Sequence, residues 1–209
     1  MVVLAFLAIT TAAQLFGYPN LPKVWFVRLV AMWLVYLALA GVALVATRST
    51  ATTPAHLIGL SAATPPRQVL VAIAVMVGLL ALVVGIPAAC GVPFADIVGP
   101  SRGGGAVLAM SLLTSILVVG PVEEFCFRGW LLGELQTVVR PWLAVVIQAV
   151  LFGVWHYPAS FSLLQVGVTT LIGAALGLVR WKVPAATVLA LGLGHGLYDA
   201  TLTIIAGLA

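Results

Sequence analysis

The sequence predicts an all-α, polytopic transmembrane bundle of about seven helices, and three observations support this. Of the 209 residues, 63% are hydrophobic and 7% are charged, whereas charged residues make up roughly 25% of ordinary globular domains. The mean hydropathy is +1.24. A soluble domain of this size cannot cover its surface with so few charges, but the chain is long enough for about six to eight spans of ~20 apolar residues.

The charge and cysteine counts exclude other classes of protein. The net charge is +4 and the pI is near 9.5. However, the basic residues stand singly between apolar runs, so membrane topology explains them better than nucleic-acid binding does. Two cysteines make no disulfide framework, and the apolar content excludes a disordered chain. The expected partner is therefore the lipid bilayer, with no nucleic acid.

The first half of the chain predicts three spans, near residues 2–18, 24–46 and 69–87. Tyr36, inside the second span, suits an interfacial or packing position. Residues 47–67, rich in Thr, Ser, Ala and Pro, and residues 91–105, with a Gly triplet, are expected to be loops. His56 and Asp96 fall in these loops. His56 is interpreted as solvated or interfacial, and Asp96 as solvated.

The segment 106–139 is unusual because an apolar run is interrupted by Gly120 and Pro121. At 1.5 Å per residue it would extend ~50 Å, well beyond the ~30 Å hydrocarbon core of a bilayer. Because proline kinks or breaks a helix, we expect either one long bent helix that reaches out of the membrane or two helices. Three further spans follow, near 142–157, 161–179 and 184–207.

The basic residues are unevenly distributed over the predicted loops. With 106–139 counted as one pass, the odd-numbered loops hold Lys23 and Arg102, and the even-numbered loops hold Arg48, Arg67, Arg140, Arg180 and Lys182. The positive-inside rule then favours a cytoplasmic location for the even loops and the N-terminus, and the assignment inverts if 106–139 crosses twice. The excess of Arg over Lys suggests a GC-rich genome, and the expected location is a bacterial cytoplasmic membrane.

Six ionisable residues lie within or at the edge of the apolar segments: Glu123, Glu124, Arg128, His156, His195 and Asp199. A charge at the bilayer centre costs ~3 kcal/mol on insertion scales, so these side chains should face the bundle interior and satisfy one another. Glu124 and Arg128 are four residues apart, as are His195 and Asp199, and Phe152 and His156, so each pair shares a helix face. Glycines around these residues allow close approach of the helices.

These residue types favour hydrolytic chemistry. A neutral imidazole and a carboxylate that share one water can remove its proton and so make a nucleophile. A second imidazole with a polar partner can donate hydrogen bonds to the oxyanion of a tetrahedral intermediate. A buried histidine or an ion pair taken alone is more often structural, and it is the joint occurrence in three apolar segments that indicates a functional site.

Three motifs in these segments resemble those of the CPBP family, which comprises CAAX proteases and bacteriocin-processing enzymes of the Abi type. Residues 121–129, PVEEFCFRG, resemble the EExxxR motif; residues 152–156, FGVWH, resemble FxxxH; and residues 195–199, HGLYD, resemble the third motif, HxxxN or HxxxD. The resemblance covers roughly residues 105–205. It divides the chain into N-terminal transmembrane helices at 1–100 and a CPBP-like catalytic core at 101–209, within a single membrane domain.

The resemblance implies an intramembrane endopeptidase of the CAAX-prenyl-protease type, acting on a membrane-associated peptide or protein. The implied catalytic residues are Glu123, Glu124, His156, His195 and Asp199, with support or substrate binding from Arg128 and Phe152. Glu123 and His156 would activate the hydrolytic water, and His195 and Asp199 would stabilise the oxyanion. The CAAX-cleaving enzymes usually have Asn at the position of Asp199, which leaves three other roles open for this residue: to orient His195, to stay protonated or to ligate a metal.

Two questions stay open from the sequence. The first is the cofactor: the family is often described as metalloprotease-like, and two His with two acids suit a Zn²⁺ site, but no HExxH motif is present and we favour a metal-free mechanism. The second is function: the alternatives are a non-proteolytic immunity or scaffold protein on the same fold, and a small proton-coupled transporter. The transporter would use Glu123 and Asp199 as a relay, although no inverted repeat is apparent.

Overall fold

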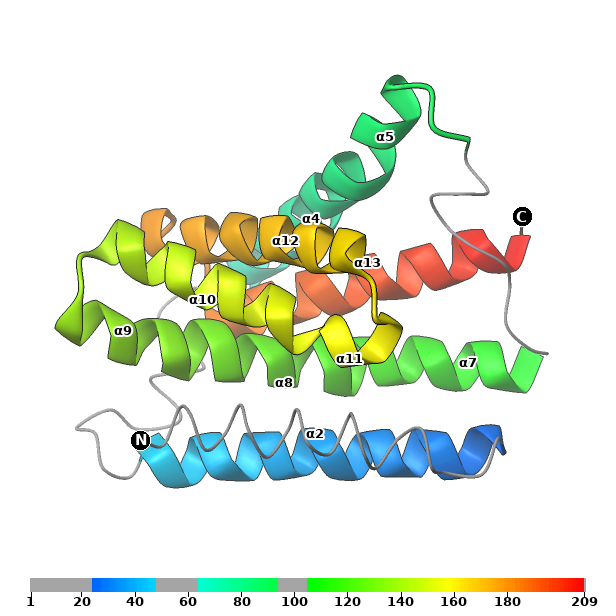
Figure 1. Ribbon diagram of the computed structural model, residues 1–209, viewed down its shortest axis with the longest axis horizontal. Helices are drawn as coiled ribbons and strands as arrows, with labels where there is room; N and C mark the ends of the chain where they lie inside the picture. Colours follow the sequence, from blue (N-terminus) through cyan, green and yellow to red (C-terminus); the bar gives the residue numbers. More distant parts are fainter. Residues whose placement is uncertain (1–23, 48–63, 94–104, 209) are drawn as a thin grey trace.

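The computed structural model describes residues 24–47, 64–93 and 105–208, and all regular structure within these ranges is helical (Figure 1). The predicted all-α class is therefore confirmed. Five of the described helices are long and apolar enough to cross a membrane, and a sixth, shorter apolar helix accompanies them. These six correspond to six of the seven expected spans. The remaining span, near 2–18, lies outside the described residues, as do His56 and Asp96.

The N-terminal described helices are α2, Trp25–Thr47, and a second helix built from α4, Pro65–Leu80, the π-helical turn η3, Ala81–Gly85, and α5, Ile86–Ala89. Two prolines open α4, where the missing N–H groups have no helical partner to lose. The π-helical turn ends two residues before Pro87. A widened turn there accommodates the proline ring, which would otherwise clash with the carbonyl four residues back.

The segment expected as either one helix or two is a single unbroken helix, Gly105–Val138. It comprises α7, Gly105–Thr114, η4, Ser115–Val119, α8, Gly120–Glu124, η5, Phe125–Leu131, and α9, Leu132–Val138. The π-helical turn η4 again ends two residues before a proline, Pro121, so the helix widens there rather than breaking. The two-helix alternative is therefore wrong.

Four helices complete the described chain: α10, Pro141–Trp155, α11, Tyr157–Ser160, α12, Leu163–Lys182, and α13, Val188–Leu208. Phe161, in the left-handed region with φ of 52°, ends α11, and the Ser162 side chain caps α12 by accepting from the Gln165 N–H at 3.3 Å. Gln148 joins α10 to α12 by donating to the Gly173 carbonyl at 2.8 Å.

Helix α13 is packed between α4 and the long helix, and its glycines allow this. A Cβ on Gly192 would lie 2.8 Å from the Pro121 Cα, and one on Gly194 would lie 2.8 Å from the Val75 Cβ. Gly192 and Gly194 are two residues apart and so face roughly opposite sides of α13. The close approach expected from the glycines is thus present, and it places His195 between two tightly packed faces.

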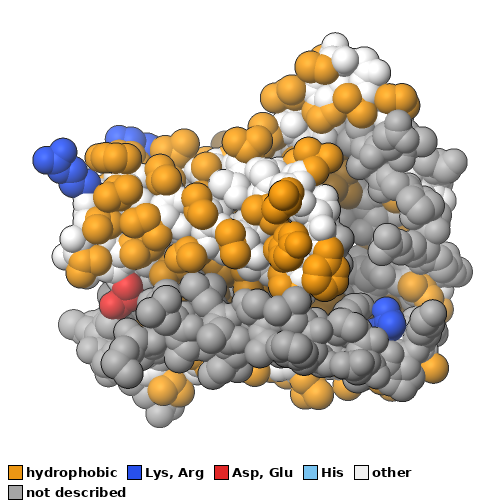
Figure 2. All heavy atoms as spheres, in the orientation of Figure 1, with side chains coloured by type: hydrophobic (Ala, Val, Ile, Leu, Met, Phe, Trp, Pro, Cys, Tyr) orange, Lys and Arg blue, Asp and Glu red, His pale blue; other side chains and the backbone are white. Residues whose placement is uncertain are grey.

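The outer surface is largely apolar. Figure 2 shows hydrophobic side chains spread over the face formed by α10 and α12, with the visible charged side chains at its edges. Exposed Leu, Val and Ile residues also occur along α2, α4 and α13. A surface of this kind is stable in contact with acyl chains rather than water, and the chain is an integral membrane protein.

Candidate active site

Three helical segments bring the six ionisable side chains together. Glu123 and Glu124 lie in α8 and Arg128 follows in η5, His156 lies at the end of α10, and His195 and Asp199 belong to α13. Both glutamates have a carboxylate oxygen within 4.0 Å of a histidine nitrogen. The convergence expected from the sequence is present, while the catalytic roles of these residues stay predictions.

Glu124 holds two of its neighbours in place. Its Oε1 accepts a hydrogen bond from Arg128 Nη1 at 2.7 Å and lies 2.9 Å from His195 Nδ1. The Arg128 guanidinium also lies over the Phe152 ring, 4.3 Å from its centroid. Since a carboxylate only accepts, Nδ1 of His195 carries a proton, and Nε2 faces the opposite side. The side chain of Glu124 is 0% exposed, which suits a positioning residue.

His156 is oriented by the end of its own helix. Its Nδ1 lies 2.8 Å from the Phe152 carbonyl oxygen, which belongs to the last turn of α10 and has no helical partner to accept from. A carbonyl can only accept, so Nδ1 donates, and the neutral ring then has its lone pair on Nε2. That nitrogen lies 3.9 Å from Glu123 Oε1. The Phe152 ring packs at 4.6 Å from the His156 ring and 6.1 Å from the His195 ring.

Glu123 has a partner that sequence reasoning missed. The Tyr36 hydroxyl, from α2, donates to Glu123 Oε1 at 2.5 Å. The sequence predicts an interfacial or packing position for Tyr36, and its ring does pack against Trp155, but its hydroxyl also bonds to the site. The available signal was a phenol in the middle of an otherwise apolar span, because a buried Tyr O–H needs an acceptor.

The remaining site groups show from which side the site is reached. Asp199 Oδ2 lies 3.8 Å from His195 Nε2, and the Asp199 side chain is 29% exposed. The His156 side chain is 19% exposed, whereas Glu123 is 2% exposed. The exposed edge of the cluster is therefore formed by His156 and Asp199, and Glu123 lies deepest.

The facing groups suit a bound water molecule. The gap between Glu123 Oε1 and His156 Nε2 is too long for a direct hydrogen bond, and one water can bridge it. Both facing atoms are acceptors, so a water that donates one hydrogen to each satisfies both and keeps its lone pairs free. Glu123 Oε2 has no hydrogen-bond donor among the described residues and lies 4.0 Å from His195 Nε2.

Metal binding was the other possibility for these side chains. Within residues 24–47, 64–93 and 105–208, no group of three or more His, Cys, Asp or Glu side chains is arranged to hold a metal ion. Glu124 is already engaged by Arg128 and His195. The described side chains therefore do not fit a zinc site with three protein ligands.

Comparison with known families agrees with the three sequence motifs. A family model described as type II CAAX prenyl endopeptidase Rce1-like matches residues 105–201. The match begins at the first residue of α7 and ends within α13, so it contains all six ionisable residues and Phe152 but not Tyr36. No curated protein and no solved structure matches the chain significantly.

Proposed function

Because the chain belongs, through residues 105–201, to the Rce1-like family of type II CAAX prenyl endopeptidases, we propose that it is an intramembrane endopeptidase. It hydrolyses a peptide bond of a membrane-associated peptide or protein with a water molecule activated by Glu123 and His156. The observation that carries the proposal is the pair of acceptor atoms, Glu123 Oε1 and His156 Nε2, that face each other across 3.9 Å.

In the proposed mechanism, the water held between Glu123 and His156 attacks the scissile carbonyl carbon and gives one proton to Glu123. The carbonyl oxygen becomes an oxyanion, and collapse of the tetrahedral intermediate breaks the C–N bond. The proton taken from the water passes to the leaving amine nitrogen. Tyr36 orients the base by donating to Glu123 Oε1, which keeps a second lone pair for the water that it shares with His156.

His195 is the proposed oxyanion donor. With Nδ1 donating to Glu124, the ring can donate from Nε2 only as the imidazolium, and the Glu124 carboxylate balances that positive charge. Arg128, which lies over the Phe152 ring, in turn donates to Glu124 and holds it in position. Asp199 lies on the Nε2 side of His195. An ionised Asp cannot donate a hydrogen bond to an oxyanion. We therefore propose that Asp199, at the exposed edge of the site, stabilises the positive charge of His195.

The test is cleavage of membrane-anchored peptides, including prenylated CAAX tails, by the purified protein in nanodiscs, followed by mass spectrometry. We expect Glu123→Gln and His156→Gln each to reduce kcat by roughly 10²–10⁴-fold, the range for loss of a general base. Glu134→Gln, on α9 of the same long helix, is the matched control and should cleave as the wild type does. Equal activity of the wild type and both site variants would refute the mechanism.

The same assay separates the two alternative functions. A non-proteolytic scaffold would show no cleavage with any anchored peptide, yet would keep its cellular phenotype when Glu123 and His195 are both replaced. A proton-coupled transporter would show flux in proteoliposomes that depends on Glu123. Metal independence is also proposed: cleavage should persist after dialysis against EDTA and o-phenanthroline, and loss of activity that Zn²⁺ restores would contradict it.

A further inference from the structure

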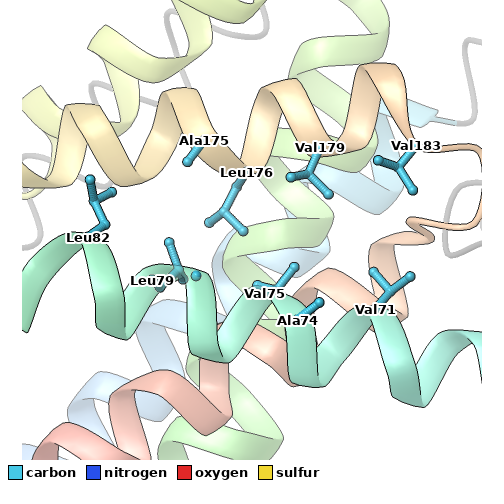
Figure 3. A pocket seen from close by; sticks show the side chains of 10 residues that line it. Val71, Ala74, Val75, Leu79, Leu82, Ala175, Leu176, Val179 and Val183 are labelled. Atoms are coloured by element: carbon cyan, nitrogen blue, oxygen red, sulfur yellow. The ribbon is translucent and has the colours of Figure 1, made fainter. Parts of the chain in front are cut away.

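An apolar groove lies between two membrane-spanning helices, away from the candidate active site. It has a volume of about 380 Å³ and is lined by α4 with η3 on one side and by α12 with Val183 on the other. This volume lies within the roughly 300–1,000 Å³ typical of ligand sites. None of the six ionisable residues of the candidate active site lines it. In Figure 3 the lining side chains of the two helices point toward each other across the gap, with Val71 and Val183 at one end and Leu82 at the other.

The groove exists because its two walls pack on other helices rather than on each other. Helix α4 packs on α13, and α12 packs on α10, while α4 and α12 make almost no mutual contact. The lining consists of Val, Leu, Ala and Gly side chains that offer no hydrogen-bonding group. Such a surface does not hold ordered water. In a bilayer, where both walls belong to spanning helices, the material that fills it is a hydrocarbon chain.

Basic residues next to the lining residues Val71 and Val183 favour an acyl chain that carries an anionic headgroup. Arg67 lies four residues before Val71, so it continues the lining stripe of α4 by one helical turn, and it is exposed. Lys182 directly precedes Val183 and is also exposed, and its Nζ lies 3.6 Å from the centroid of the Trp181 ring. A half-buried Arg180 lies one turn from Leu176. Tryptophan and cations together are typical of the headgroup level of a membrane, and clustered cations there attract anionic lipids.

We propose that this groove binds one acyl chain of an anionic phospholipid whose phosphate is held by Arg67 and Lys182. The chain runs from the Val71–Val183 end toward Leu82 and fills the space between α4 and α12. The bound lipid thereby couples two helices that otherwise make little direct contact. The proposal is independent of proteolysis, because its measurement is lipid binding.

The experiment is native mass spectrometry and thermal unfolding of delipidated protein titrated with phosphatidylglycerol or with phosphatidylcholine of the same acyl chains. We expect one phosphatidylglycerol to be retained and to raise the Tm, with phosphatidylcholine bound roughly tenfold more weakly or less. The double variant Arg67→Gln/Lys182→Gln should lose about tenfold or more in affinity for phosphatidylglycerol, since each cation near the headgroups contributes about 1 kcal/mol. Arg140→Gln, at the α9–α10 turn, should bind as the wild type does.

A second pair of variants tests the groove itself. A Cβ on Gly78 meets nothing within 4 Å, so Gly78→Leu fills the groove without a clash and should abolish retention of the lipid. Gly167→Leu, at an equally open position on α12 outside the groove, is the matched control and should retain it. Equal binding of the two lipids, or unchanged binding by either the double variant or Gly78→Leu, would overturn the proposal.

Discussion

The two halves of the bundle have nearly the same apolar composition but very different packing. The packed half contains α2 from Tyr36 onward, the long helix from Gly120 to Leu132 and α13 from Val188 to Ala200. The open half contains α7 with η4, α2 before Tyr36 and α13 after Ala200. None of residues 26–35 or 201–207 is buried, and Thr114 is the buried residue of α7. Figure 1 shows both regions along the same three helices.

The candidate active site lies where the two halves meet, and this explains its contrasting groups. Glu124 and Arg128 belong to the packed half and are buried completely, whereas His156 and Asp199 are partly exposed. A hydrolytic site in a membrane needs both properties. A rigid, dry side holds charged groups in fixed positions, and a looser side admits water and a peptide. Variants on the two sides should therefore differ most in stability.

The largest expected effect comes from breaking the buried pair on the packed side. Arg128→Met leaves Glu124 without its guanidinium, and removing one member of a buried ion pair typically costs about 3–5 kcal/mol. We expect a large fall in the Tm of the protein in detergent, together with loss of cleavage. Arg140→Met, at an exposed cation of the α9–α10 turn, should leave the Tm within a degree or two. Similar Tm values for the two variants would show that the packed side is not rigid.

Glycines in a single helix give a closely matched comparison of the two halves. Gly192→Ala places a Cβ 2.8 Å from the Pro121 Cα, and overpacking against backbone costs about 1–3 kcal/mol. Gly207→Ala, in the open half of the same helix, meets its nearest atom, Leu108 Cδ1, at 4.0 Å. We expect the first variant to lower the Tm and the second to leave it unchanged or raise it slightly, because alanine favours helix. Equal effects would contradict the difference in packing.

Tyr36→Phe tests the boundary between the halves. It removes the donor to Glu123 Oε1 but keeps the ring that packs on Trp155. Leaving a buried acceptor unpaired costs about 1–3 kcal/mol, so we expect a moderate fall in Tm and a fall in kcat with little change in KM. Trp33→Phe, which removes a hydrogen bond to Thr114 in the open half, is the control. A change in KM alone would indicate that Tyr36 contacts substrate rather than orienting Glu123.

The sequence predicted the helices and the six ionisable residues because these depend on local pattern. Long apolar runs specify spans, and charges inside them must meet one another. The spacing of four residues correctly predicted the contact of Glu124 with Arg128 and of Phe152 with His156. The sequence does not predict whether the helix continues through Pro121 or breaks there. The outcome depends on a π-helical turn that has no sequence signature of its own.

Tyr36 and the unequal packing of the two halves were missed for a different reason. Tyr36 lies 87 residues before Glu123, so no spacing rule connects them, and the family match does not reach α2. Residues 26–35 are as apolar as residues 36–45, since lipid and protein interior select the same side chains in a membrane. Only the arrangement of the helices decides which of these two stretches is buried.

The smallest effect is expected at Asp199, a partly exposed side chain at the edge of the site. Asp199→Asn is nearly isosteric, its side chain is partly exposed, and its Oδ2 makes no contact with His195 shorter than 3.8 Å. We expect the Tm to stay within a degree or two of the wild type and kcat/KM to change by less than roughly tenfold, since the amide, unlike an ionised Asp, can itself donate a hydrogen bond near the oxyanion and so offset the lost charge. The contrast with Arg128→Met, measured in the same detergent, is the informative quantity. A Tm loss as large as that of Arg128→Met would mean that Asp199 is part of the rigid side, and that the exposed edge of the site must be reassigned.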